Sequence, residues 1–128
     1  MAHPLAFKWT SVLINDINGQ PFEDIEGPVM DLRDINEQTG SATNCTQGGN
    51  RFTDGKATPV NGQRPLRFRV LFKHPDGTNH RGFAIENSNG EVVMIVGTLS
   101  LPRNFDRKHK AEELADQTEA TWVATKGG

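Results

Sequence analysis

The chain has 128 residues, of which 34% are hydrophobic, so it can fold as one domain, residues 1–128, around one core. Its 14 basic and 16 acidic residues leave a net charge of −2, whereas a nucleic-acid-binding protein would carry a basic excess. The apolar runs are far shorter than the ~20 residues that span a bilayer. The sequence therefore predicts a soluble protein with neither a nucleic-acid nor a membrane partner.

The N-terminal stretch MAHPLAFKWTSVLI lacks a basic leader and a clear small-residue cleavage site. We interpret it as the first strand and not as a signal peptide; a leader removed earlier would leave secretion open, so the localisation is not predicted. Cys45 is the single cysteine, which excludes an internal disulfide, and no Cys/His spacing suggests zinc. The sequence gives no indication of a metal or a cofactor.

Strand patterns dominate the chain, because short runs of alternating or β-tolerant composition are separated by turn residues. In chain order these runs are residues 6–14, 29–32, 41–45, 57–60, 66–73, 78–86, 91–101 and 119–126. The clearest is LRFRVLFK at residues 66–73, whose apolar members on one face indicate a core-facing strand. Residues 47–56 are predicted to be a long exposed loop. The one helical candidate is residues 107–115, a short connector.

Two turn motifs link the central runs into a meander. The sequence His74-Pro75-Asp76-Gly77 has the composition of a tight turn, and Asn89-Gly90 fits the two central positions of a type I′ turn. Residues 66–73, 78–86 and 91–101 should therefore form consecutive antiparallel strands. The whole pattern predicts an all-β fold, a single antiparallel up-and-down β-barrel of about seven or eight short strands with one short helical connector; a sandwich is the alternative.

Residues 91–101 are apolar on both alternating faces. A strand in an antiparallel sheet with one solvent-exposed face should alternate apolar and polar residues. A second layer or a second subunit should therefore cover the second face of this strand.

Five segments resemble the avidin and streptavidin family. EGPVM at residues 26–30 and EQTGSA at residues 37–42 are similar to that family's first hairpin, and FRVLFKH at residues 68–74 is similar to its central strand. HRGF at residues 80–83 is similar to a later hairpin, and TEATW at residues 118–122 to the approach to a late strand. The resemblance implies an eight-stranded, up-and-down, often tetrameric calycin-like barrel. Pro28 and Ala42 stand where the family's biotin site has a Ser and a Tyr, so it implies an altered ligand.

On the same resemblance, a set of aromatic, small and polar side chains points into the barrel. The set comprises Phe72, Thr78, His80, Gly82, Ala84, Thr98, Ser100 and Trp122. Aromatic walls with a few polar groups are typical of a small-molecule site. We therefore predict Phe72, Thr78, His80, Thr98, Ser100 and Trp122 as ligand-binding residues. The alternative is that the two aromatic residues belong to an ordinary core.

The predicted function is binding of a small molecule in a partly apolar lumen. The alternative is a cofactor-free barrel enzyme of the cyclase or isomerase kind acting on a hydrophobic metabolite, because such an enzyme would leave no catalytic motif. A third possibility is an interaction module with a filled core. If Thr98 and Ser100 face the lumen, the apolar residues at the alternate positions of the same strand face outward. They predict a homo-oligomer through the outer face of residues 91–101. These outward residues would be Val93, Ile95, Leu99 and Leu101.

Overall fold

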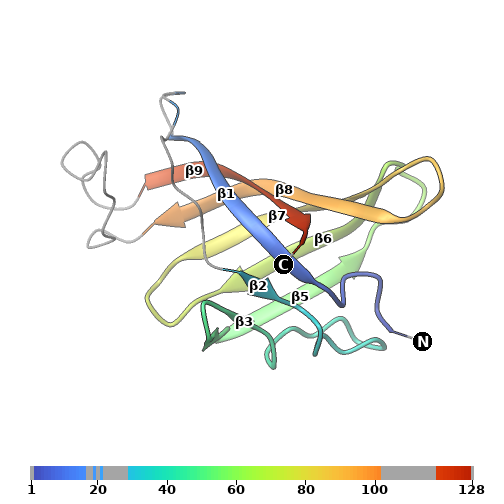
Figure 1. Cartoon of the computed structure of the whole chain (residues 1–128), viewed down its shortest axis with the longest axis horizontal. Coiled ribbons are helices and arrows are strands. Elements are labelled where there is room, and N and C mark those ends of the chain that lie inside the picture. The colour runs from blue at the N-terminus through green and yellow to red at the C-terminus, as the bar shows by residue number, and fades with distance from the viewer. Residues whose placement is uncertain (1, 17–18, 20, 22–28, 102–117, 128) are drawn as a thin grey trace.

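The computed structural model describes residues 2–16, 19, 21, 29–101 and 118–127, and these contain nine strands (Figure 1). The strands are β1 (Lys8–Asp16), β2 (Met30–Asp31), β3 (Thr46–Gln47), β4 (Asn50–Arg51), β5 (Asp54–Pro59), β6 (Leu66–Lys73), β7 (Asn79–Glu86), β8 (Val92–Leu101) and β9 (Thr118–Lys126). They form one antiparallel sheet in the order β4-β3-β2-β1-β9-β8-β7-β6-β5. The prediction of an all-β fold is confirmed.

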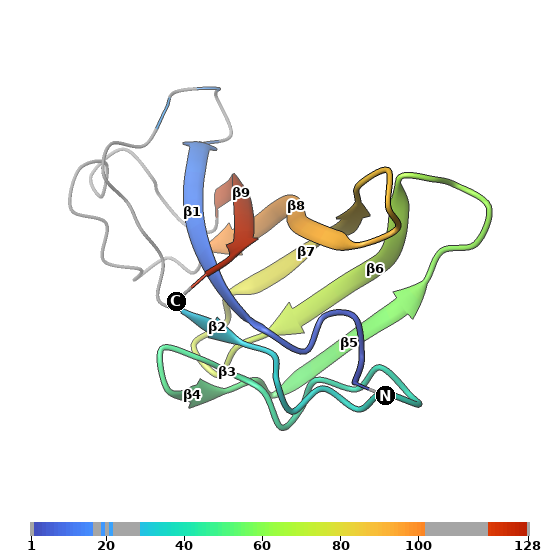
Figure 2. The ribbon, with the colours of Figure 1, turned by 45° about the vertical axis from the view of Figure 1, so that its right-hand side comes forward.

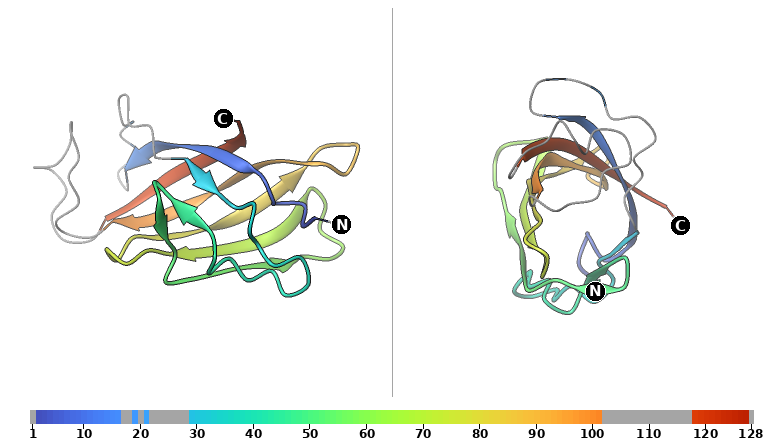
Figure 3. Two further views of the ribbon diagram at one scale, coloured as in Figure 1. Left: turned by 60° about the horizontal axis from the view of Figure 1, so that its bottom comes forward. Right: turned by 90° about the vertical axis from the view of Figure 1, so that its left-hand side faces the viewer.

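The sheet is a curled meander in which β1 and β9, the first and last strands in the sequence, pair with each other. Strands β5 to β9 run side by side in sequence order, and β9 then pairs with β1 (Figure 2). Seen from the end, the strands curve into a barrel-like arrangement (Figure 3). The backbone of residues 40–42 meets the free side of β5, since Ala57 N donates to Gly40 O at 2.9 Å and Ala42 N donates to Gly55 O at 2.9 Å.

The strand pattern was predicted less well before residue 54 than after it. The structure describes nine strands, whereas seven or eight were predicted. The difference comes from β3 and β4, which are two-residue strands that follow the predicted strand 41–45 and fall in or next to the predicted loop 47–56. Residues 41–45 themselves form a single bridge at Ser41 and then a turn. The predicted helical connector 107–115 lies outside the described residues. Within those residues, no helix is long and apolar enough to cross a membrane.

The core is built from alternate residues of the strands, as a curled sheet with one inner face requires. Its largest fully buried side chains are Trp9, Trp122, Phe72, Leu5, Met30, Leu32, Ile95, Leu99, Val70 and Cys45. Burial raises the pKa of the Cys45 thiol to about 11, which keeps it protonated and unreactive at neutral pH. The interior therefore consists of packed side chains drawn from both the meander and the N-terminal strand.

The predicted orientation of β8 is wrong. Directly opposite residues of an antiparallel pair share a face, and His80 pairs with Leu99, not with Thr98. Ile95 and Leu99 are accordingly buried, with 0% and 2% exposure, whereas Thr98 is exposed. The two apolar side chains gain more from burial than a Thr and a Ser would.

The sequence also predicted that Val93 and Leu101 face outward, and the structure describes the side chain of Val93 only. The register shifts by one residue at the start of β8, where Val92 pairs with Glu86 and Met94 with Ile85, leaving Val93 as the extra residue of a bulge. Its side chain is half-buried, and the Leu101 side chain lies outside the described residues.

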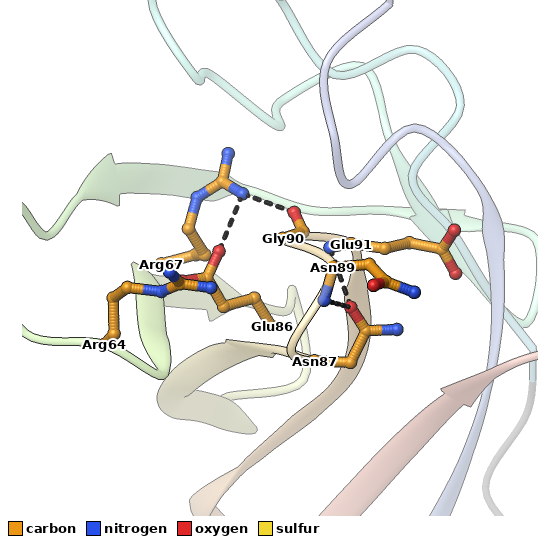
Figure 4. A network of polar contacts seen from close by, with 7 residues as sticks. All are labelled: Arg64, Arg67, Glu86, Asn87, Asn89, Gly90 and Glu91. Atoms are coloured by element: carbon orange, nitrogen blue, oxygen red, sulfur yellow. Dashed lines mark hydrogen bonds and ion pairs between the residues drawn. The ribbon is translucent and has the colours of Figure 1, made fainter.

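Both predicted hairpins form, although one turn differs from the prediction (Figure 4). Gly90 N donates to Asn87 O at 3.0 Å, which puts Ser88 and Asn89 at the centre of the turn and Gly90, with φ 79°, after it. The Asn87 side-chain oxygen accepts hydrogen bonds from Asn89 N and Glu91 N. This is a three-residue loop with a left-handed glycine, not the predicted two-residue type I′ turn.

An ion-pair network fixes the same end of the sheet (Figure 4). The buried Glu86 carboxylate accepts hydrogen bonds from Arg64 Nε at 2.5 Å and Arg67 at 3.2 Å, and Arg67 also donates to Gly90 O at 2.8 Å. Burial alone would raise the pKa of Glu86, but the hydrogen bonds and charges of the two arginines outweigh it and lower the pKa. The network ties β6 and β7 to the following turn.

Gly82 and Gly97 face each other across β7 and β8, where the two backbones approach closely. A Cβ on Gly97 would lie 1.9 Å from Arg81 O, and one on Gly82 would lie 2.1 Å from Val96 O. Trp122 is the register partner of Gly97 on the other side, so its indole lies beside a position without a side chain. The glycine pair thus marks a required close approach and not a space left for a ligand.

Replacing Gly97 with Ala should destabilise the fold strongly, because the new methyl group would clash with backbone that has no room to move. We expect a loss on the order of 3 kcal/mol in the free energy of unfolding, measured by urea denaturation. Gly127→Ala is the matched control, since its Cβ would meet nothing closer than Thr10 Oγ1 at 3.5 Å. Equal unfolding midpoints for the two variants would contradict the close approach.

Candidate functional site

A cluster of rings lies where β6 ends and β7 begins, and it draws on five parts of the chain. Phe72 comes from β6, His80 from β7 and Trp122 from β9, while His74 belongs to the β6–β7 turn and Phe52 precedes β5. We call these five residues and Thr78 the ring cluster. The turn is closed by a hydrogen bond from His74 N to Thr78 O at 2.9 Å.

The rings of the cluster contact one another in sequence. Phe72 stacks on Phe52 with centroids 5.0 Å apart, and His74 meets Phe52 edge-on at 4.9 Å. His74 contacts His80 at 5.0 Å, and His80 meets Trp122 edge-on at 4.9 Å. These are the separations and angles that aromatic pairs prefer. The five rings therefore form one continuous series of contacts that includes both imidazoles.

The two imidazoles are joined by a hydrogen bond of 3.2 Å between His74 Nε2 and His80 Nδ1. Either nitrogen can be the donor. If His74 donates, His80 Nε2 carries a proton and His74 Nδ1 is an acceptor; if His80 donates, these roles exchange. Within the described residues no hydrogen bond engages either outer nitrogen. The pair thus always offers one donor and one acceptor.

Burial keeps both imidazoles neutral. It lowers the pKa of His80 to about 3, with a smaller contribution from the neighbouring His74, while Asp76 acts weakly in the opposite direction. Burial also lowers the pKa of His74, again partly offset by Asp76. At neutral pH the cluster therefore carries hydrogen-bonding capacity without charge.

Thr78 adds a hydroxyl to the cluster. Its amide donates to Asp76 Oδ1 at 2.9 Å, but its Oγ1 is buried and has no hydrogen-bond partner among the described residues. The residue is only 7% exposed. Leaving such a group unpaired costs about 1–3 kcal/mol, so an unpartnered hydroxyl here requires an explanation.

Of the six predicted ligand-binding residues, the structure brings four together and separates two. Phe72, Thr78, His80 and Trp122 are buried in the ring cluster. Thr98 and Ser100 lie on the outer face, where Ser100 Oγ accepts a hydrogen bond from the exposed Arg81 at 3.3 Å. Their predicted placement in the lumen is wrong, because the register of β8 puts Leu99, and not Thr98, on the face of the buried His80.

Sequence reasoning missed Phe52 and His74. His74 continues the alternation of Phe68, Val70 and Phe72, and extending that pattern by one step would have placed it inside. Phe52 had no comparable signal, because it lies in a glycine-rich stretch whose backbone pairing is set by a distant strand, with Thr53 N donating to Lys73 O at 2.8 Å.

No protein family, curated protein or solved structure matches this chain. Among the residues that the structure describes, no group of three or more His, Cys, Asp or Glu side chains is arranged to hold a metal ion.

The neutral His80 should make stability fall as the pH is lowered. The unfolded chain binds a proton near pH 6.5 and the folded protein only near pH 3, so the unfolded state holds more protons between these values. We expect His80 to lower the free energy of unfolding by about 2 kcal/mol between pH 7.5 and pH 5, measured by urea denaturation. Glu86 does not contribute in this range, because its lowered pKa confines its effect to lower pH.

The control for this pH dependence is His80→Phe, which keeps a ring against Trp122 but cannot be protonated. Its stability should vary much less between the two pH values, with a residual slope of the same sign from His74 and His3, whose pKa values are also lowered by burial. An unchanged slope in His80→Phe would show that His80 is not buried as a neutral group.

Proposed function

We propose that the protein binds a small molecule at the ring cluster. The observation that carries this proposal is the buried Thr78 hydroxyl, which has no partner among the described residues. Thr78 is tied to the imidazole pair through its backbone, because its carbonyl accepts a hydrogen bond from His74 N, and the outer nitrogens of that pair are also unengaged within the described residues. Native proteins satisfy nearly all buried polar groups, and a bound ligand would supply the missing partners. Aromatic surface with a few polar groups is the usual composition of such a site.

The proposed architecture is a closed up-and-down barrel similar to that of the avidin family. The meander order of β5 to β9, the pairing of β9 with β1, and the hydrogen bonds of residues 40–42 to β5 support this arrangement. The binding site would lie at the end of that barrel where the β6–β7 turn carries the half-buried His74.

Replacing Thr78 with Val should change stability and binding in opposite directions. Removing the unsatisfied hydroxyl should raise the free energy of unfolding by about 1 kcal/mol, while the loss of a ligand contact should weaken binding. Native mass spectrometry of protein purified from its natural host should show wild type above its 14.1 kDa chain mass and Thr78→Val depleted of the added mass.

The matched control is Thr98→Val, which makes the same substitution on the outer face and should leave both the added mass and the stability unchanged. A wild-type protein that carries no molecule, and whose melting temperature no compound raises, would overturn the proposed function. Equal ligand content in Thr78→Val and wild type would remove Thr78 from the site.

The second candidate function is a cofactor-free enzyme acting on a hydrophobic metabolite. The neutral, hydrogen-bonded pair His74 and His80 favours it, because one outer nitrogen can accept a proton while the other gives one up. Turnover of the co-purifying molecule, abolished in His80→Phe, would support the enzyme over the binding protein.

We also propose that the protein self-associates through the outer face of β7, β8, β9 and β1. One row across these strands is apolar at every position: Phe83, Val96, Val123 and Val12 are register partners in turn. Phe83 and Val12 are 37% and 36% exposed. This outer row replaces the one predicted from the sequence.

A second copy of the chain is the occupant that suits the charges at the edge of this row. Arg81 and Glu119 form an ion pair of 3.0 Å there, and each side chain is about half exposed. Because the edge offers one charge of each sign, a copy related by a twofold axis can exchange these partners without repulsion.

Analytical ultracentrifugation tests this surface. Wild type should sediment at twice the chain mass, and Phe83→Thr with Val123→Thr should be monomeric, whereas Lys56→Thr at an exposed position of β5 should remain dimeric. Arg81→Glu and Glu119→Arg should each weaken the dimer, and the double exchange should restore it. A monomeric wild type, or a dimer that survives the Phe83 and Val123 substitutions, would overturn the proposal.

A further inference from the structure

We infer that Asn61 is a modification site, where spontaneous deamidation converts the side-chain amide into a carboxylate. Asparagine followed by glycine favours this reaction, because the glycine nitrogen can reach the asparagine Cγ without interference from a Cβ of its own. The chain has three such pairs, Asn18-Gly19, Asn61-Gly62 and Asn89-Gly90. Asn18 lies outside the described residues, so the structure distinguishes the other two. The inference is independent of the proposed function.

The reaction needs water as its only co-reactant. The Gly62 nitrogen attacks Cγ of Asn61, the new N–C bond closes a succinimide ring, and the bond from Cγ to Nδ2 breaks. Nδ2 leaves as ammonia after taking up the proton of the Gly62 amide. Water then adds to either carbonyl carbon of the ring and opens it, which gives aspartate or isoaspartate without any oxidation or reduction. Each conversion makes the net charge of −2 more negative by one.

The loop between β5 and β6 leaves the reacting groups of Asn61 and Gly62 free. Both residues are exposed, and within the described part of the chain no hydrogen bond engages the Gly62 nitrogen or the Asn61 side chain. A Cβ on Gly62 would meet nothing within 4 Å, so neighbouring atoms do not obstruct the approach of the nitrogen to Cγ. The structure therefore leaves this pair as reactive as its sequence allows.

The β7–β8 turn holds the same dipeptide in place (Figure 4). Gly90 N already donates to Asn87 O at 3.0 Å, and Gly90 O accepts a hydrogen bond from Arg67 at 2.8 Å. Asn89 N donates to Asn87 Oδ1 at 2.9 Å. Attack by Gly90 N must break its own hydrogen bond and displace a glycine whose carbonyl oxygen Arg67 holds. Each broken hydrogen bond slows the reaction by about fivefold, so Asn89 should react at least about tenfold more slowly than Asn61.

Deamidation at Asn61 should change the charge of the protein without unfolding it. The hydrogen bonds that close the loop do not involve the reacting pair. Val60 N donates to Arg67 O at 2.9 Å, and Leu66 N donates to Gln63 O at 2.8 Å. The extra backbone methylene of an isoaspartate therefore falls in a segment that has no backbone pairing to lose. The protein should accumulate as charge isoforms that differ in this exposed loop.

Peptide mapping by mass spectrometry, after incubation of the whole protein in mildly alkaline buffer, tests this site. Tryptic peptide 57–67 contains Asn61 as its one asparagine, and peptide 82–103 contains Asn89. In the folded protein Asn61 should be converted at least about tenfold faster than Asn89. In urea, where the turn is unfolded, the two should react at similar rates. Buffer prepared with oxygen-18 water should label the product, which separates this reaction from deamidation during digestion.

Asn61→Gln is the matched control, because its longer side chain closes the corresponding ring much more slowly, and it should abolish the conversion of peptide 57–67. Asn61→Asp carries the charge of the product and should keep the urea midpoint of the wild type; a lower midpoint would contradict the claim that the fold tolerates the change. Equal rates at Asn61 and Asn89 in the folded protein would overturn the selectivity. A peptide 57–67 that stays unmodified when folded but is converted in urea would overturn Asn61 as the site.

Discussion

The close approach of Gly82 and Gly97 is the constraint on which the arrangement of the ring cluster depends. Where these two residues pair, a Cβ on either one would overlap backbone atoms of the other strand. Trp122 pairs with Gly97 in register, and a hydrogen bond from its Nε1 to Thr98 O at 3.0 Å fixes its indole. Trp122 in turn supports His80.

The two ends of the meander treat buried polar groups in opposite ways. At one end the Glu86 carboxylate is charged and fully compensated by Arg64 and Arg67, so the network is complete without any further molecule. At the other end the imidazoles are kept neutral, and the hydroxyl of Thr78 has no partner within the described chain. Satisfied networks stabilise and specify a fold, whereas an unsatisfied group that persists suggests a binding role.

Alternation predicted the meander well because β6 and β7 bury one face and expose the other. The motif at residues 74–77 and the Asn87–Glu91 segment also gave the correct hairpins. The same rule failed for β8, since its two faces are both apolar and only the pairing of His80 with Leu99 decides which one is inside. The bulge at Val93 and the two-residue strands β3 and β4 leave no periodic pattern at all.

The candidate site was predicted in part for the same physical reason. Phe72 and His80 follow from strands whose inner face is clear in the sequence, whereas Thr98 and Ser100 were assigned to a strand whose register was not. Phe52 reaches the cluster only through long-range backbone pairing beside β6. Local patterns cannot indicate contacts that depend on how distant segments close the sheet.

The two tryptophans provide the most direct test of where a ligand binds. The Trp122 indole belongs to the ring cluster, where it contacts His80, whereas the Trp9 indole donates to Leu5 O at 3.0 Å in the N-terminal segment. In a nitrogen–proton correlation spectrum, addition of the molecule that co-purifies with the protein should shift the indole N–H signal of Trp122 and leave that of Trp9 in place. A shift of Trp9 alone, or of the outer-face amides of Val96 and Val123 with Trp122 unmoved, would contradict binding at the ring cluster.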